Sequence, residues 1–121
     1  MANVQESLHA ISEEVDGFVG AALVDFDGGL TLGTIGGGDL DMDIAGAGNL
    51  EVVRAKNRVM KQLGLDDQIE DILITLGQQY HLIRPLHSHG SVFLYLALHR
   101  DLGNLGLARH KLRTIEDALE F

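Results

Sequence analysis

The sequence predicts an α+β domain built on a five-stranded antiparallel sheet. Five segments have strand-like composition, and the connections between consecutive strands are short enough for hairpins. Three amphipathic helical patterns accompany them, in the order helix, two strands, helix, three strands, helix. Two of the strands are apolar on both sides, so we expect helices to cover both faces of the sheet.

The length and composition favour a single globular domain over residues 1–121. A chain of 121 residues can bury one hydrophobic core but not two, and it contains no cysteine for a disulfide, a thiolate nucleophile or a zinc–sulfur site. No apolar run approaches the ~20 residues of a membrane helix. The N-terminus also lacks the basic start and apolar block of a secretory signal, so we expect a cytoplasmic protein.

The charge is unevenly distributed along the chain. A net charge of -9 argues against nucleic acid and anionic membranes as partners, although residues 1–53 contain no lysine or arginine. A basic group then follows, and it consists of Arg54, Lys56, Arg58 and Lys61. On a helical wheel Arg54, Arg58 and Lys61 share one side. This side is either a solvated surface that complements the helix dipole or a candidate docking stripe for an acidic partner protein.

The first part of the chain predicts a helix followed by a hairpin. Apolar residues recur at helical spacing over Asn3–Val15, and Asn3 can cap this helix. Phe18–Phe26 is apolar on both parities, as expected for a strand covered on both faces. Asp27-Gly28-Gly29 then favours a tight turn into a weaker edge strand over Leu30–Ile35.

The longest helical pattern covers Asp43–Leu63, after the flexible connection Gly36–Gly38. Its apolar arc is roughly twice the ~100° stripe that packing on one sheet requires. The excess must therefore cover a second element of the chain or meet another molecule. Gly46 and Gly48 indicate either the close approach of another backbone or a frayed first turn, since each glycine costs about 1 kcal/mol inside a helix.

The second part of the chain predicts three consecutive antiparallel strands and a final helix. The strands are Ile69–Leu76, Tyr80–Leu86 and Val92–Leu98, of which the last is the most apolar and should be central. Pro85 cannot donate to a ladder, so we expect it at a strand end or bulge. Asn104 caps the last helix.

No segment predicts a catalytic, cofactor or metal site. Asp39–Asp43 has the acidic spacing of a calcium loop, but Ile44 and Leu50 stand where such a loop needs glycine and glutamate. His87-Ser88-His89 has ligand-like spacing without a third or fourth ligand nearby. No serine has an activating context, and adjacent acids point in different directions. The residues alone favour a non-catalytic interaction domain.

Four segments carry a resemblance to a known family: AGAGNLEVVRAK, EDILITLGQQYHLIRPL, VFLYLALHR and NLGLARHKL. In this order of elements, they resemble the Roadblock/dynein light chain superfamily, most closely its small bacterial, actinobacterial-type members. The resemblance covers about residues 4–119. It implies a profilin-like sheet with strand order 2-1-5-4-3, with one long helix on one face and the two terminal helices on the other.

The resemblance also implies partners. Family members form homodimers in which the third strand, here Ile69–Thr75, pairs with its symmetry mate and the long helices pack together. Bacterial relatives bind a small Ras-like GTPase, and some stimulate its hydrolysis while others only scaffold. No shared arginine finger can be placed on this sequence. The resemblance therefore predicts a homodimeric adaptor that binds such a GTPase and modulates its nucleotide hydrolysis, without an active site or cofactor of its own.

The wide apolar arc and the resemblance together predict a self-association patch. It consists of Leu50, Val53, Asn57, Met60, Ile69, Asp71, Leu73 and Thr75. The other side of the helix, with Val52, Val59 and Leu63, should cover the sheet. Arg54, Arg58 and Lys61 then remain as the candidate docking surface for a third protein.

Two alternative functions are compatible with the sequence. One is a signalling scaffold that joins a sensor kinase or another signalling protein without changing nucleotide turnover. The other is a small-ligand-sensing domain with a pocket lined by Tyr80, His81 or Tyr95. The identity of the GTPase, assembly beyond a dimer and the effect of Gly36–Gly38 on binding stay open.

Overall fold

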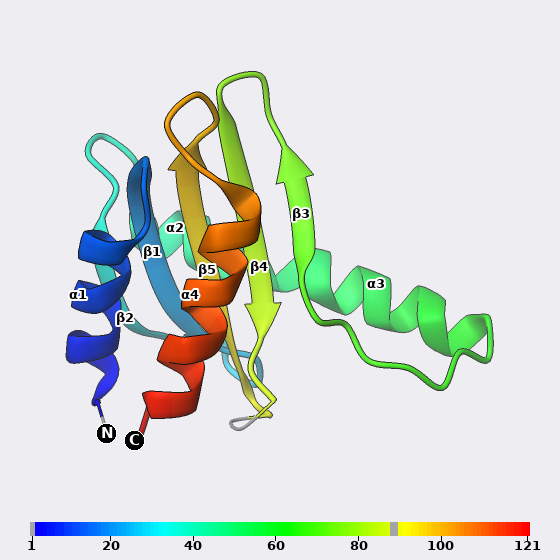
Figure 1. The fold of residues 1–121 in the computed structure, drawn as a ribbon. Coiled ribbons are helices and arrows are strands. Elements are labelled where there is room, and N and C mark those ends of the chain that lie inside the picture. The colour runs from blue at the N-terminus through cyan, green and yellow to red at the C-terminus, as the bar shows by residue number, and fades with distance from the viewer. Residues whose placement is uncertain (1, 88–89) are drawn as a thin grey trace.

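A five-stranded, fully antiparallel sheet forms the centre of the structure (Figure 1), which is a computed structural model that describes residues 2–87 and 90–121. The strand order is β2-β1-β5-β4-β3, as predicted. The elements are α1 (Val4–Glu14), β1 (Phe18–Asp25), β2 (Thr31–Gly36), α2 (Met42–Gly48), α3 (Leu50–Gln62), β3 (Ile72–Thr75), β4 (Gln79–Pro85), β5 (Val92–His99) and α4 (Leu105–Ala118). Within the described residues, no helix is long and apolar enough to cross a membrane.

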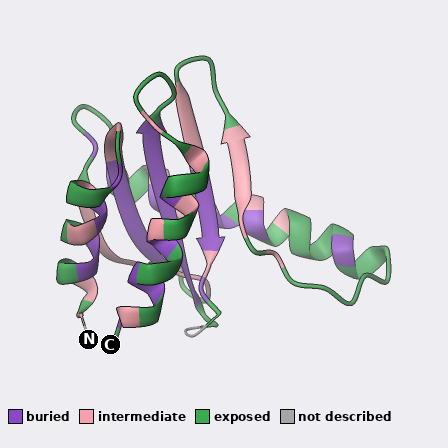
Figure 2. Cartoon of the chain, in the orientation of Figure 1, coloured by how far each residue is buried: buried purple, intermediate pink, exposed green. Residues whose placement is uncertain are grey.

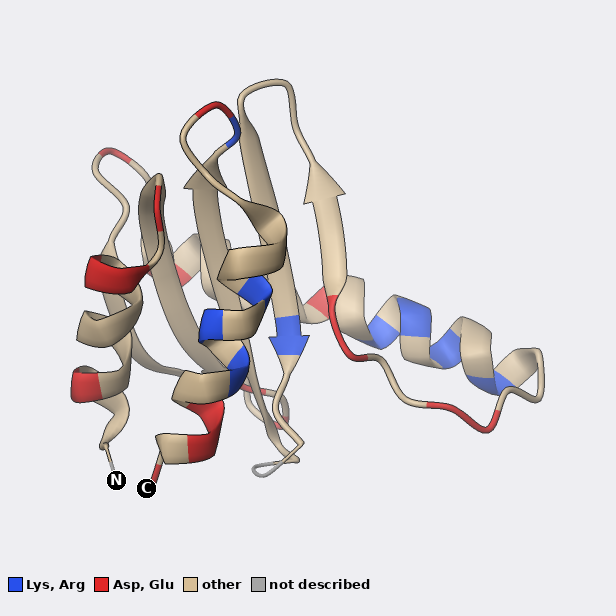
Figure 3. Ribbon diagram, viewed as in Figure 1, with Lys and Arg blue, Asp and Glu red and all other residues tan. Residues whose placement is uncertain are grey.

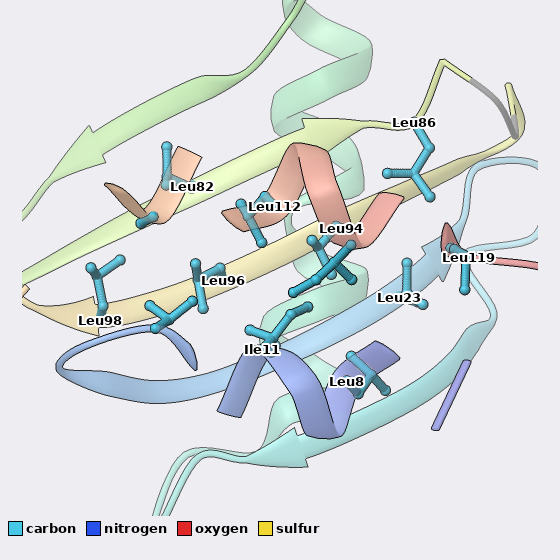
Figure 4. Packing of buried hydrophobic residues seen from close by; sticks show 14 of the residues in the cluster. Leu8, Ile11, Leu23, Leu82, Leu86, Leu94, Leu96, Leu98, Leu112 and Leu119 are labelled. Carbon is cyan, nitrogen blue, oxygen red and sulfur yellow. The ribbon is translucent and has the colours of Figure 1, made fainter. Parts of the chain in front are cut away.

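One face of the sheet carries the two terminal helices. α1 packs on β1 and β2 and also contacts α4. Figure 4 shows Leu8 and Ile11 of α1 and Leu112 of α4 directed at leucines of the central strands, including Leu94 and Leu96. These five side chains are at most 4% exposed, so this face has a continuous core.

The other face carries α2, which lies over β1 and β2. A Cβ added to Gly46 would come within 3.0 Å of Ala22 Cβ and Val24 Cγ2, whereas one added to Gly48 would meet no atom within 4 Å. The close approach indicated by the glycines therefore involves Gly46 and the sheet of the same chain.

The helical pattern over Asp43–Leu63 forms two helices in the structure, because the chain bends at Asn49. The Asn49 side chain donates to the Ala45 carbonyl at 2.6 Å, and its backbone N–H donates to Gly46 O at 3.2 Å. These two local hydrogen bonds take the place of the regular backbone hydrogen bonds of a continuous helix. α2 thus stays on the sheet while α3 leaves it (Figure 1).

The bend reverses the orientation that the sequence predicted for α3. Leu50, Val53 and Met60, expected to face another molecule, are only 6%, 0% and 9% exposed within the monomer. Val59 and Leu63, expected to cover the sheet, are 41% and 66% exposed. The predicted sheet-facing side is wrong for Val59 and Leu63 but not for Val52, which packs against the core of this face. A wheel drawn for one straight helix cannot give the direction of α3 after the bend.

β3 is shorter than predicted, since it begins at Ile72 and not at Ile69. Ile72 pairs with Ile83, so the two residues before it, Asp71 and Glu70, would oppose Arg84 and Pro85 if the strand continued. Pro85 has no N–H and ends β4, as expected. Residues 69–71 therefore lie beyond the ladder with β4.

Candidate self-association and docking surface

α3 and the segment that follows it form an arm that projects beyond β3 (Figure 1). We define the arm as residues 50–71 and its returning limb as residues 63–71. Leu50 and Val53 pack into the core of the sheet, and Arg54 Nη2 donates to the Phe26 carbonyl at 2.9 Å. Further out, Leu65 N–H donates to the Met60 carbonyl at 3.0 Å. The sheet therefore supports only the first part of α3, and a hydrogen bond at its C-terminus starts the returning limb.

The outer part of the arm exposes apolar side chains. Val59, Leu63 and Leu65 are 41%, 66% and 53% exposed, and Figure 2 shows most of this part of α3 as exposed. Single exposed leucines are common, but three along one projecting element form a patch of the kind that marks an interaction surface.

A shallow groove of about 560 Å³ runs between α3 and the returning limb. Its floor is apolar and consists of Val52, Met60, Leu65, Ile69 and Ile72. Lys56 borders it on the helix, and Asp67, Glu70 and Asp71 border it on the limb. The groove joins the exposed apolar patch to the start of β3.

β3 is an edge of the sheet that pairs with β4 on one side only. Its sequence, ILIT, has no charge and no proline to discourage pairing with another strand. Ile72 and Ile74 lie on the α2/α3 face, whereas Leu73 packs on the core of the other face. An apolar free edge of this kind favours pairing with a further strand.

Asp71 is held on the α4 side by a bidentate ion pair with Arg109. The Arg109 Nε to Asp71 Oδ2 distance is 2.8 Å and the Nη2 to Oδ1 distance is 3.1 Å. The hydrogen bond to Asp71 raises the pKa of Arg109 above its ordinary value. This pair fixes the point at which the returning limb enters β3.

The structure brings the predicted patch residues to one region but gives them different roles. Leu50 and Val53 lie in the core beneath α3, and Met60 lies at the groove, while Asn57 and Thr75 are exposed. Ile69, Asp71 and Leu73 are intermediate in exposure and follow the free edge. The sequence analysis did not identify Val59, Leu63 and Leu65 as exposed. Their apolar character was the only signal in the sequence that could have marked them.

The basic residues of α3 form a stripe in which Arg54 differs from the rest (Figure 3). The Arg54 guanidinium is bonded to Phe26 O and lies 3.5 Å from Glu51 Oε1. Arg58 and Lys61 are exposed farther along the helix. Figure 3 also shows acidic residues along the returning limb, so the arm has one basic side and one acidic side.

A polar cluster lies on the α2/α3 face of the sheet, away from the arm. His81 Nδ1 is 3.1 Å from Tyr95 Oη, and His81 Nε2 is 2.8 Å from Gln79 Oε1. The rings of His81 and Tyr95 meet edge to face at 88°. Burial lowers the pKa of His81 and raises the pKa of Tyr95.

The three residues named for the ligand-sensing alternative lie on two faces of the sheet, and Tyr80 lines a hollow. Tyr80 packs on the core of the opposite face, where the Arg100 guanidinium lies 5.3 Å from its ring centre. It therefore shares no cavity with His81 and Tyr95. The hollow beside it is lined by Gly77, Gln78, Tyr80, His99, Arg100 and Asp101.

The residues considered for metal binding form no cluster of ligands among those described, and Asp41 caps a helix. Asp41 Oδ1 caps α2 by accepting from the N–H groups of Asp43 and Ile44 at 3.0 and 3.2 Å. His87 N–H donates to Glu116 Oε2 at 2.7 Å, and Ser88 and His89 lie outside the described residues. Among residues 2–87 and 90–121, no three His, Asp or Glu side chains converge as a metal site.

Solved structures share this architecture. A Roadblock/LC7 domain from Streptomyces avermitilis superposes with a TM-score of 0.82 at 12% identity, over 97% of this chain and 94% of that one. Myxococcus xanthus MglB gives 0.78 at 15% identity, over 94% and 91%. An MglB with a tetrameric arrangement gives 0.78 at 17% identity, over 94% and 82%.

Sequence comparison adds no closer relative. No protein-family model matches this sequence, and no curated protein sequence matches it. At these identities the likeness concerns the fold. The strand order, the helices on both faces and the superpositions over nearly the whole chain together show that this protein has the Roadblock/LC7 fold.

Proposed function

We propose that this protein is a non-catalytic homodimer that binds a small Ras-like GTPase and regulates its nucleotide hydrolysis. The observation that carries the homodimer is the arm, which presents an apolar patch, a groove and an unprotected strand edge in one continuous region. The GTPase is the partner implied by the resemblance to Roadblock proteins.

In the proposed dimer, a twofold axis lies near the middle of β3, between Leu73 and Ile74. The edges of the two subunits pair antiparallel, and each arm crosses to the other subunit, as twofold symmetry requires of a self-complementary surface. Val59 and Leu63 enter the interface with Met60 and Asn57, while Leu50 and Val53 support the helix from beneath. Opposite charges on the two sides of the arm fix its register.

Sizing tests the homodimer. Val59→Glu together with Leu63→Glu introduces four charges per dimer into the apolar patch, so the variant should elute as a folded monomer in light-scattering chromatography. Leu107→Glu is a matched control, because Leu107 is 43% exposed on α4, away from the arm. A double variant that remains dimeric at micromolar concentration would contradict the proposed interface.

The exposed basic residues are the proposed docking surface for the GTPase. Arg58 and Lys61 are free of the core, so Arg58→Glu with Lys61→Glu should weaken binding by tenfold or more while leaving the fold intact. Arg54 is unsuitable for this test, because its side chain holds Phe26.

A pull-down with a small Ras-like GTPase, in both nucleotide states, tests the partner. Hydrolysis rates measured on the same samples then separate the two regulatory roles. Stable binding with unchanged hydrolysis would favour the scaffold, and no binding in either nucleotide state would contradict the proposed partner.

A further inference from the structure

The contacts of His81 with Tyr95 and Gln79 favour one protonation state of the imidazole. With Gln79 Oε1 placed 2.8 Å away as an acceptor, His81 Nε2 is the nitrogen that carries a proton. The Tyr95 hydroxyl then donates to an unprotonated Nδ1 at 3.1 Å. Tyr95 is 1% exposed, so a protonated Nδ1 would leave its buried hydroxyl proton without this acceptor. The hydrogen bonds therefore favour neutral His81.

Gln79 and His81 lie on a part of the sheet that the chain's own helices do not cover, whereas Tyr95 is buried. α2 lies over β1 and β2, and α3 crosses the sheet at the Ile72 end of β3. His81 is opposite Ile74, toward the other end of β3. Ile74, Gln79 and His81 are each intermediate in exposure, and we call these three residues the open face.

Twofold symmetry brings the open face beneath the partner's arm. This step rests on the homodimer of the proposed function. Antiparallel pairing of the two β3 edges places the Thr75 end of one strand beside the Ile72 end of the other. α3 leaves the sheet at the Ile72 end, and its 13 residues extend about 20 Å, the width of roughly four strands. The outer half of each α3 thus passes over the partner's open face.

We propose that the open face is the docking surface for the α3 of a second copy of this chain, and that this contact forms only while His81 is neutral. In this contact Val59 and Leu63 of the second copy, which are exposed in the monomer, cover Ile74 and the His81 ring. Self-association is therefore sensitive to acid.

The proposed contact also brings charged groups of the partner's arm near His81. On its own face the neighbouring titratable groups are Tyr95 and, at the end of β5, His99, opposite Gln79. Lys56 of α3 borders the groove and would repel an imidazolium, whereas Asp67, Glu70 and Asp71 of the returning limb border the same groove and would attract one. Arg58 and Lys61 lie on the other side of α3 from Val59 and Leu63, so they do not face His81. The hydrogen bonds and the burial of the ring, and not this mixed charge, therefore carry the acid sensitivity.

The sign of the pH dependence follows from the burial of His81. Burial lowers the pKa of His81 below 6.5 already in the monomer, and a covering helix lowers it further. When the pH falls below the pKa of His81 in the monomer, this residue takes up a proton in free chains but not in the dimer. Proton uptake therefore favours dissociation of the dimer. Each His81 can contribute up to about tenfold in dissociation constant per pH unit, and the two in a dimer up to about 100-fold. Acid also protonates carboxylates. In a chain with net charge -9, this reduces the repulsion between two copies and so has the opposite effect, favouring the dimer.

Cross-linking tests the placement. The chain has no cysteine, so Leu63→Cys in one preparation and Gln79→Cys in another each provide a single thiol. After mixing at pH 7.5, a short bis-maleimide should link the two variants into a dimer that neither gives alone. Leu63→Cys mixed with Thr34→Cys, on the far edge strand β2, is the control and should give none. Absence of the first product, or an equal yield with Thr34→Cys, would overturn the placement.

Sedimentation velocity at pH 7.5 and 5.5 tests the acid sensitivity. The wild type should have a higher dissociation constant at pH 5.5 than at pH 7.5, and His110→Gln, which changes an exposed histidine on α4, should behave alike. His81→Phe combined with Tyr95→Phe removes both the titrating ring and the unpaired hydroxyl, so its dissociation constant should not rise at pH 5.5. A pH-independent wild-type dimer would overturn this inference alone, whereas a wild-type monomer at pH 7.5 would overturn the proposed homodimer as well.

Discussion

The two faces of the sheet differ in how completely this chain covers them. On one face, α1 and α4 contact each other and the sheet, and Leu8, Ile11 and Leu112 are at most 2% exposed. On the other face, α2 covers two strands and α3 leaves the sheet after its first turns. The helices of this chain bury the core of the first face. On the second face, α3 continues into the arm, where Val59 and Leu63 are exposed.

This difference assigns stability and association to opposite sides of one sheet. Substitutions on the α1/α4 face should lower the free energy of unfolding of the monomer at every protein concentration. Substitutions on the arm should change how stability depends on concentration, because a partner that binds only folded chains stabilises them by mass action.

The largest expected effect concerns the ion pair that closes the α1/α4 face. Arg84 and Glu116 are 8% and 6% exposed, and Arg84 Nε and Nη2 lie 2.9 and 2.8 Å from Glu116 Oε1. Glu116→Ala leaves the guanidinium buried without its counter-ion and should lower the free energy of unfolding by about 3–5 kcal/mol, measured by urea denaturation.

The exposed pair between Lys111 and Glu14 provides the matched comparison for Glu116→Ala. Its 3.4 Å contact is largely solvated, with side chains 33% and 46% exposed, so Glu14→Ala should cost less than about 1 kcal/mol. Equal losses in the two variants would show that the buried pair does not close this face.

The next effect tests whether the α1/α4 face is independent of association. Leu112 is 2% exposed, and Leu112→Ala should cost about 2–5 kcal/mol through lost burial and a residual cavity. Denaturation at two protein concentrations a hundredfold apart should give the same loss relative to wild type. A loss that grows with dilution would mean that this face also contributes to the interface.

The fold was predictable wherever local pattern determines it. Val92–Leu98 was identified as the central strand because it is apolar on both parities, and β5 lies between β1 and β4. Pro85 ends its strand as expected, because the missing N–H is a property of the residue itself. Asn3 and Asn104 cap α1 and α4, since their side chains reach only three residues along the chain.

The candidate site was less predictable because it depends on contacts between distant residues. The pattern over Asp43–Leu63 is continuous, and only the approach of Gly46 to β1 sets the direction of α2 and hence the bend. Asp71 is bound by Arg109, 38 positions away, which no spacing rule indicates. The predicted self-association patch therefore includes Leu50 and Val53, which lie on the buried side of α3.

The smallest effect distinguishes two glycines of α2 that look equivalent in the sequence. Gly46→Ala gains about 1 kcal/mol of helix propensity, but its Cβ would lie 3.0 Å from Ala22 Cβ, which has no rotamer to move away. We expect a net loss of up to about 2 kcal/mol. Gly48→Ala meets open space and should raise the free energy of unfolding by about 0.5–1 kcal/mol. Thermal denaturation of both variants beside wild type measures the pair. Two stabilised variants would mean that α2 rests loosely on the sheet, which would leave the whole α2/α3 face, and not only the arm, dependent on a partner.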